Sequence, residues 1–426
     1  MPKIAIIGAG SVVFTRRLLG DVLSFPSIRD SEISLMDIDA ERLEMISALG
    51  ERMAKDSGTG ARIEATSDRE RSLEGADYVI TTIRVGDDDA VDRGIPQRYG
   101  VDQAVGDTIG PGGVIKALRT VPVLIDICRD MERLCPEAWL LNYTNPMAIA
   151  CWAISDATSI QNVGLCHSVQ NTARQLSEYI GANLSDVSFW TAGINHMAWY
   201  LRLENQGSDA YPALRAAMDD PQIFVKDPVR FEVMRHFGYF VSESTRHMSE
   251  YVPYFRGEPG RMERFGLAPF DVGARAQQRR VDSHYQAISD ELASDTPMSP
   301  QRTNEYAAYI MDSMETGTPR RVNVNVRNSG LISNLPEGSC VEVPCMVDDL
   351  GVHPSHVGDL PDQCAGLIQS NINLHRLTVK SIMEGDREAA IHAAMLDPLT
   401  ASILSLSEIR AMMGEMFDAQ PEYFAS

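Results

Sequence analysis

An excess of basic charge, long apolar runs and a regular cysteine framework are all missing from this chain of 426 residues. Its 59 acidic residues outnumber 38 basic ones, giving a net charge of -21 that disfavours nucleic acid and anionic membranes and favours a small ligand. No apolar run approaches the ~18 residues of a membrane span, and a strand from Ile4 onward leaves no room for a signal peptide. The seven cysteines are irregularly spaced, which favours reduced thiols in a cytoplasm.

Short apolar runs alternate with helical periodicity over the first 200 residues. This alternation predicts a parallel sheet with helices on both faces. The predicted strands are KIAIIGAG, EISLMDID, ADYVITTIR, AWLLNYTNP and QNVGLC.

The rest of the chain has a mixed pattern. It predicts helices over about 268–293 and 299–316, a strand pair within 320–336 and 340–354, and further helices from about 361 to 417. No repeat or low-complexity linker separates the two parts, so we expect them to share a continuous interface. We place a nucleotide-binding domain at 1–195 and a mixed α+β domain for substrate, metal and oligomer contacts at 196–426.

A glycine turn directly follows the first predicted strand. Gly8 and Gly10, then Ser11, precede a predicted helix, an arrangement that lets a pyrophosphate approach the helix N-terminus. Val13 occupies the place of the usual third glycine. Asp37 ends the next strand, where a carboxylate accepts ribose hydroxyls and repels a 2'-phosphate. The pattern favours a Rossmann-type doubly wound sheet binding NAD over NADP; a plain glycine turn beside a capping aspartate is the alternative.

Two further groups follow later strands. Residues 142–147 (NYTNPM) place amides at the carboxyl edge of the sheet, where ligands bind, although an Asx turn alone gives the same pattern. Cys166 follows another short strand, and His196 comes 30 residues later after VSFWTAGINH. A thiolate and an imidazole make half of a divalent-metal site with positions open for substrate oxygens. A buried cysteine and a core histidine are the alternative.

Taken in order, these motifs resemble glycoside hydrolase family 4. The resemblance covers nearly the whole chain and includes GDTIGPGGVIKALRTVP at 106–122, GLCHSVQ at 164–170, GINHMAWY at 193–200 and NVRNSGLISNLPEGSCVEVP at 325–344. It implies a fold like that of lactate and malate dehydrogenases, and hydrolysis of glycosides with NAD and a divalent metal, usually Mn²⁺. Cys166-His167-Ser168-Val169 is most similar to α-galactosidases of the melibiase type.

The resemblance also implies roles for individual residues. Gly8, Gly10 and Ser11 would bind the pyrophosphate, Asp37 the ribose, Cys166 and His196 the metal, and Asn145 and Arg327 the sugar. His167 stands where related phosphoglycosidases have an aspartate credited with acid catalysis.

The resemblance also suggests the base, because some relatives place a catalytic tyrosine in a Tyr-x-x-Tyr-aromatic segment. Tyr251 begins such a segment here, and His247 is the alternative. Other relatives use an aspartate near this chain's Ser244 and Thr245, where no carboxylate aligns. An aromatic residue packed at a domain seam is the structural alternative for Tyr251.

The implied reaction explains why one protein needs both NAD and a metal. NAD takes hydride from sugar C3, the acidified C2 proton is removed, the C1 oxygen leaves, and water and hydride are then returned with retention. The expected substrate is an α-galactoside such as melibiose, with an α-galacturonide or α-glucoside as alternatives. A dehydrogenase of the lactate or malate kind and a non-catalytic redox sensor are less favoured, since neither explains Cys166 with His196. We expect a homodimer or homotetramer.

Overall fold

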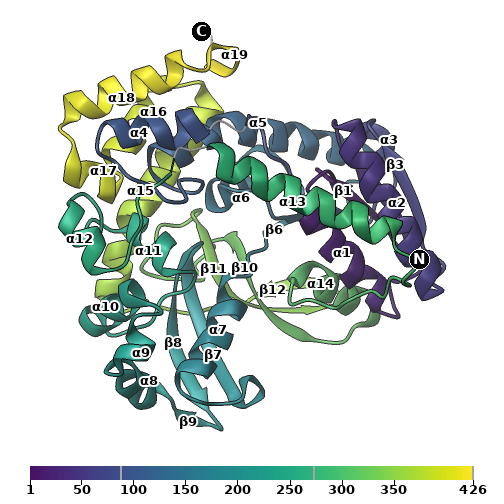
Figure 1. The fold of residues 1–426 in the computed structure, drawn as a ribbon, viewed down its shortest axis with the longest axis horizontal. Helices are drawn as coiled ribbons and strands as arrows, with labels where there is room; N and C mark the ends of the chain where they lie inside the picture. The colour runs from purple at the N-terminus through teal and green to yellow at the C-terminus, as the bar shows by residue number, and fades with distance from the viewer. Residues whose placement is uncertain (87–88, 272–273, 425–426) are drawn as a thin grey trace.

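The computed structural model describes residues 1–86, 89–271 and 274–424. The strands within these residues are β1 (Lys3–Ile7), β2 (Glu32–Met36), β3 (Arg62–Thr66), β4 (Tyr78–Thr81), β5 (Trp139–Asn142), β6 (Asn162–Gly164), β7 (Val187–Ile194), β8 (Met197–Asn205), β9 (Ser208–Asp209), β10 (Arg320–Arg327), β11 (Cys340–Asp348) and β12 (Gly351–Pro354). They form one sheet in the order β3-β2-β1-β4-β5-β6-β10-β11-β7-β8-β9, with β12 paired to β11 (Figure 1).

The helices surround this sheet. They are α1 (Val12–Ser24), α2 (Ala40–Ser57), α3 (Arg69–Leu73), α4 (Ile95–Arg98), α5 (Gly110–Leu134), α6 (Met147–Ala157), α7 (Ser168–Tyr179), α8 (Tyr211–Met218), α9 (Pro221–Phe224), α10 (Pro228–Phe237), α11 (Thr245–Tyr251), α12 (Pro259–Arg264), α13 (Ala274–Ala293), α14 (Tyr306–Thr316), α15 (Asp362–Glu384), α16 (Arg387–Met395), α17 (Pro398–Ile403), α18 (Leu406–Asp418) and α19 (Pro421–Phe424).

The first six strands of the sheet are parallel and confirm the predicted doubly wound architecture. Their order, β3-β2-β1-β4-β5-β6, is that of a dinucleotide-binding sheet. All five predicted strands are present. β1 and β4, for example, are buried apolar runs with helices on both sides of the sheet. Helices α1, α2, α13 and α14 pack together on one face, and α3, α5, α6, α15 and α16 pack on the other.

The C-terminal part extends the same sheet with antiparallel strands. β10 and β11 confirm the predicted pair, in a register that places Asn325 opposite Glu342. β10 also pairs with β6, and β11 pairs with β7. The predicted division between residues 195 and 196 falls in the turn between β7 and β8, which pair with each other, and it stays a prediction.

The predicted helices of the C-terminal part are present with different starts. α13 begins at Ala274, and α14 begins at Tyr306 rather than near 299. The segment before α14 is held as a loop because the Asp21 carboxylate accepts a hydrogen bond from the Thr303 hydroxyl at 2.6 Å. Helices α15 to α18 account for the predicted helical stretch from 361 to 417. None of the described helices is long and apolar enough to cross a membrane.

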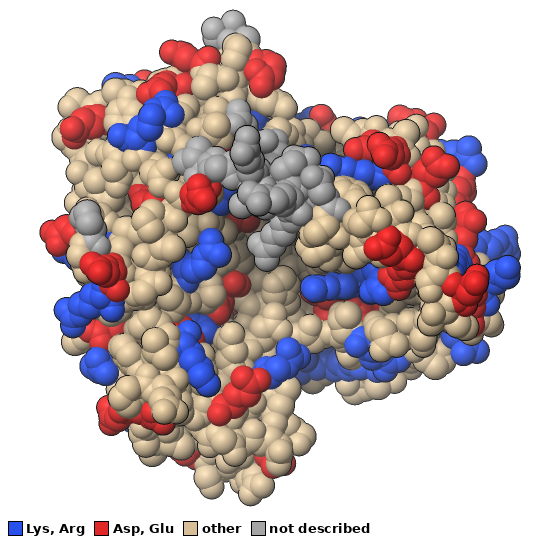
Figure 2. All heavy atoms as spheres, viewed as in Figure 1, with Lys and Arg blue, Asp and Glu red and all other residues tan. Residues whose placement is uncertain are grey.

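One face of the molecule is hollowed near its middle. Figure 2 shows this hollow with Lys and Arg side chains on both of its sides. Acidic and basic side chains are interspersed over the viewed face, so the acidic excess does not gather there as one patch.

Candidate functional site

The glycine turn and Asp37 meet at the carboxyl edge of β1 and β2. A Cβ at Gly8, where φ is +94°, would lie 2.8 Å from the Thr82 carbonyl carbon, so this position requires glycine. A Cβ at Gly10 would lie 2.7 Å from an Asp37 oxygen, so that carboxylate would have to move. The Gly10 amide donates to Asp37 Oδ2 at 2.6 Å. Ser11 precedes α1 without capping it by a side-chain hydrogen bond. These residues therefore form a glycine cradle, closed to a side chain at Gly8, next to a carboxylate and a helix N-terminus.

Asn145 lies at the carboxyl edge of β5, as predicted. Its amide donates to Asp107 Oδ2 at 3.2 Å, while Asn145 Oδ1 is buried without a partner among the described residues. Asp107 lies 3.8 Å from Lys116. Burial opposes the Asp107 charge, but the Lys116 ammonium and the neighbouring histidines hold the pKa of this carboxyl below its usual value. Asn142 instead bonds within the sheet edge, accepting from Thr81 at 2.8 Å.

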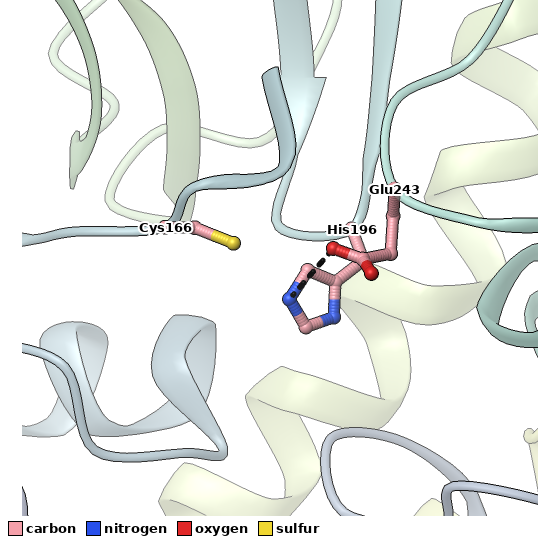
Figure 3. Close-up of side chains that lie close together, drawn as sticks. All are labelled: Cys166, His196 and Glu243. Carbon is pink, nitrogen blue, oxygen red and sulfur yellow. Dashed lines mark ion pairs between the residues drawn. The ribbon is translucent and has the colours of Figure 1, made fainter. Parts of the chain in front are cut away.

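Cys166 and His196 come together with a third residue, Glu243. One ligand atom of each lies within 4.8 Å of the others, and Figure 3 shows the sulfur of Cys166 directed towards the other two side chains. His196 Nε2 is 3.7 Å from Glu243 Oε2. Register explains the meeting: Gly164 of β6, Asn325 of β10, Glu342 of β11 and Gly193 of β7 form one row across the sheet, just before the Cys166 and His196 turns.

Burial sets the protonation of this cluster. It raises the pKa of the Cys166 thiol well above its usual value, and the Glu243 and Glu342 carboxyls add to this. It lowers the pKa of His196 to about 4, so the imidazole is neutral at pH 7, the form that binds metals. A buried thiol beside two carboxyls needs a cation to become a thiolate. The cluster therefore fits a divalent metal with sulfur, nitrogen and oxygen ligands.

Tyr251 and His247 both border this cluster. The Tyr251 ring centroid is 6.4 Å from that of His196, and its hydroxyl donates to Thr108 Oγ1 at 2.8 Å. The His247 centroid is 4.6 Å from that of His196, and its Nδ1 lies 3.2 Å from Glu243 Oε1. Burial raises the pKa of Tyr251 well above its usual value and lowers that of His247 to about 4. The two predicted base candidates thus both reach the site.

His167 lies beside the same cluster with its side chain 47% exposed. Its Nδ1 is 3.4 Å from an oxygen of Glu305, and this contact raises the pKa of the imidazole. An acidic partner favours the protonated ring, which a proton donor requires.

Arg327 is the predicted site residue that the structure does not bring here. It ends β10, which runs antiparallel to β6, so it lies towards the amino end of β6 and away from Cys166. There it forms an ion pair with Asp156, near the C-terminal end of α6.

Sequence reasoning missed three carboxylates of the site: Glu243, Asp107 and Glu305. The expectation that no carboxylate aligns near Ser244 needs correction, because Glu243 directly precedes this residue and faces His196. Asp107 lay within the quoted GDTIGPGG segment, where an acid in a glycine-rich loop was the available signal. The Glu250 carboxylate fixes that loop by accepting from the amides of Val105 and Gly106 at 2.7 and 3.0 Å.

Comparison with known families agrees with the order of these motifs. The model of "Family 4 glycosyl hydrolase" matches residues 3–182, and that of its C-terminal domain matches residues 191–400. The chain belongs to family 4 of the glycosyl hydrolases. The resemblance drawn from the sequence motifs is confirmed, and this family 4 protein is a glycosidase.

Similar proteins include several α-glycosidases. This family 4 chain is 39% identical to an α-galactosidase of Bacillus subtilis (strain 168), covering 99% of this chain and 100% of the relative. It is 36% identical to an α-galactosidase of Rhizobium meliloti (strain 1021), over 99% of this chain and 89% of the relative. An α-glucosidase of Erwinia rhapontici is 32% identical, covering 96% and 97%.

Solved structures confirm the fold. A Bacillus subtilis protein described as a candidate glucosidase has a TM-score of 0.88 at 26% identity, covering 98% of this chain and 99% of that one. A 6-phospho-β-glucosidase of Thermotoga maritima, solved with manganese, NAD⁺ and glucose-6-phosphate, has a TM-score of 0.81 at 23% identity, covering 99% of both. A malate dehydrogenase of Plasmodium falciparum has a TM-score of 0.56 at 13% identity, covering 90% and 99%. The predicted likeness to dehydrogenases is thereby confirmed for the fold.

Proposed function

We propose that this family 4 glycosidase hydrolyses α-galactosides with NAD and a divalent cation, Mn²⁺ by preference, without net oxidation of the sugar. The observation that carries this proposal is the meeting of Cys166, His196 and Glu243 at the same sheet edge as the glycine cradle. An ordinary dehydrogenase of this fold has no use for such a cluster.

The cofactor residues fit NAD. Gly8, Gly10 and Ser11 would hold the pyrophosphate, because the turn leaves the backbone open to a ligand at the N-terminus of α1, and Asp37 at the end of β2 would hold the ribose hydroxyls. Cys166, His196 and Glu243 would hold the metal. When bound, NAD accepts a hydride from sugar C3 and the cation acts as a Lewis acid on the C2 and C3 oxygens.

The chain's own residues then position the sugar and move protons. Asn145 and Asp107 face the cluster with buried oxygens that lack partners among the described residues, and they would accept hydroxyl hydrogen bonds. Tyr251 would remove the C2 proton, with His247 as the alternative base. His167, half-exposed beside the cluster, would protonate the leaving oxygen.

The choice of galactoside rests on the Cys166-His167-Ser168-Val169 sequence and on two α-galactosidases among the relatives. Their names supply the substrate of this proposal. The α-glucosidase relative keeps an α-glucoside as the alternative, and an α-galacturonidase at 27% identity does the same for a galacturonide. The homodimer or homotetramer and the cytoplasmic location stay predictions.

One assay tests the proposal. The purified protein is incubated with NAD, Mn²⁺ and 4-nitrophenyl derivatives of α-galactose, α-glucose and α-galacturonic acid, and released phenol and accumulated NADH are both measured. We expect phenol release from the galactoside without NADH accumulation, and its loss in Cys166→Ser or in excess chelator. NADH accumulation would show a dehydrogenase, and neither product would show a binding protein. Faster hydrolysis of the α-glucoside or the α-galacturonide would make that sugar the substrate in place of α-galactose.

A further inference from the structure

His167 has a buried carboxylate behind it. The Glu305 side chain is 3% exposed, and its Oε1 lies 3.4 Å from His167 Nδ1, whereas the His167 side chain is 47% exposed. The carboxylate therefore contacts the inner nitrogen of the ring. The other nitrogen, Nε2, makes no hydrogen bond or ion pair with the described residues, and the side chain that carries it is half-exposed, so a substrate can reach it.

Glu305 is fixed from two sides. Its amide donates to Thr303 Oγ1 at 3.2 Å, and Thr303 donates to Asp21 of α1 at 2.6 Å. The neighbouring Asn304 accepts from Gln170 at 3.1 Å and donates to Asn171 at 2.7 Å, and both of these residues belong to α7, which starts directly after His167. The carboxylate thus keeps its place relative to the nucleotide-binding helix and to the helix that carries the histidine.

The buried Glu305 carboxylate has few hydrogen-bond or ion-pair partners. Glu305 Oε2 has no partner among the described residues, and the described cationic partner of Glu305 is His167. Carboxylates in this position select the imidazole tautomer and ring orientation in other acid–base sites.

We propose that Glu305 is the positioning residue of His167, accepting from Nδ1–H so that Nε2–H faces the glycosidic oxygen. The inference rests on the proposed function, in which His167 is the acid. As the C1–O bond breaks, its electron pair stays on the leaving oxygen and the Nε2 proton moves to that oxygen. The water that later adds at C1 returns a proton to Nε2, so the site is restored.

Leaving groups of different acidity test this role. A nitrophenolate leaves without protonation, whereas the sugar hydroxyl of melibiose needs an acid. For Glu305→Gln we expect kcat/KM for melibiose to fall by roughly 10- to 100-fold, the usual effect of losing an orienting partner, with less than about a 3-fold change for 4-nitrophenyl α-galactoside. Glu305→Ala should lose more on melibiose, and Glu305→Asp should recover part of it. Equal losses on the two substrates, or none, would overturn the inference.

A matched control lies on α14, the helix that begins directly after Glu305. Glu315 of α14 accepts from the Tyr78 hydroxyl at 2.8 Å, so Glu315→Gln makes the same chemical change in a different contact and should leave the ratio of the two rates unchanged. A selective loss on melibiose in this control too would also refute the role of Glu305. If a Glu305 variant is unstable, nitrogen NMR of His167 in the wild-type protein decides between the tautomers. A neutral ring protonated on Nδ1 supports the proposal, and a neutral ring protonated on Nε2 alone overturns it.

His167→Asn separates this inference from the proposed function. A selective loss on melibiose in His167→Asn but not in Glu305→Gln would overturn the role of Glu305 and keep the histidine as acid. No selectivity in His167→Asn would remove the acid assignment and the inference with it, while NAD- and Mn²⁺-dependent hydrolysis of the nitrophenyl substrate would leave the glycosidase proposal standing.

Discussion

Tyr251→Phe separates the proposed base from the scaffold. The ring is 1% exposed, and the substitution keeps its packing while deleting a hydroxyl that donates to Thr108 at 2.8 Å. The lost hydrogen bond should lower the free energy of unfolding by only about 1 kcal/mol. If the phenolic oxygen removes the C2 proton, the rate should fall by roughly two to four orders of magnitude. Unfolding in urea and phenol release measure these two effects.

The matched control removes the same hydrogen bond from its other side. Thr108→Val should cost a similar ~1 kcal/mol of stability but leave the phenol in place, so the rate should fall much less than in Tyr251→Phe. Wild-type enzyme in deuterated water should place deuterium at C2 of the released sugar, and Tyr251→Phe should lose this exchange together with hydrolysis. Near wild-type turnover in Tyr251→Phe with failure of His247→Asn would refute the assignment. Unchanged C2 hydrogen in wild type would count against proton abstraction there.

Three further predictions follow from other contacts. Glu243→Gln should weaken Mn²⁺ binding by roughly 100-fold, because a carboxylate leaves the cluster, and electron paramagnetic resonance of free Mn²⁺ measures this; unchanged affinity would exclude Glu243 as a ligand. Asp37→Asn should weaken NAD binding by about 10-fold in a fluorescence titration, since charge-assisted bonds to ribose are lost, and equal affinity would place the ribose elsewhere. Burial raises the pKa of Asp397 to about 6, above its ordinary 3.8, so the stability from its protonated form is complete below about pH 4 and lost as pH rises through 6. The unfolding free energy of Asp397→Asn relative to wild type should therefore increase between about pH 3 and 7, by up to about 3 kcal/mol, and a pH-independent difference would contradict this.

Strands buried on both faces were predictable, and an exposed one was not. β1 and β4 read as unbroken apolar runs because helices cover them on both sides. β3 has the mixed sequence Arg-Ile-Glu-Ala-Thr and no fully buried residue, since it lies at the sheet edge. β3 forms a strand by pairing with β2, and its own sequence has no pattern that predicts a strand.

The site residues also fall into two groups, those that the sequence places together and those that only the folded sheet does. Cys166 and Asn145 follow parallel strands, and parallel strands end at one edge, so their sequence positions alone place them together. Glu243 and Glu305 lie in loops of the C-terminal part. These loops reach the site only because β10 and β11 pair between β6 and β7, a register that the sequence does not reveal. Arg327 was chosen from a motif, and that same antiparallel register carries it away from Cys166.

The unbroken sheet also limits how this enzyme can move. β1 carries the glycine cradle, and β6 and β7 lead into the two predicted metal ligands, all within one hydrogen-bonded ladder. Hinge closure needs a flexible joint between rigid bodies, and the continuous pairing of β1, β4, β5 and β6 offers none between the glycine cradle and Cys166. In the proposed reaction, the separation between NAD and a cation at Cys166 would therefore be set by strand spacing rather than by a closing motion. Substrate entry and product release would then depend on loops and helices around this edge, while the cradle and Cys166 keep a fixed separation.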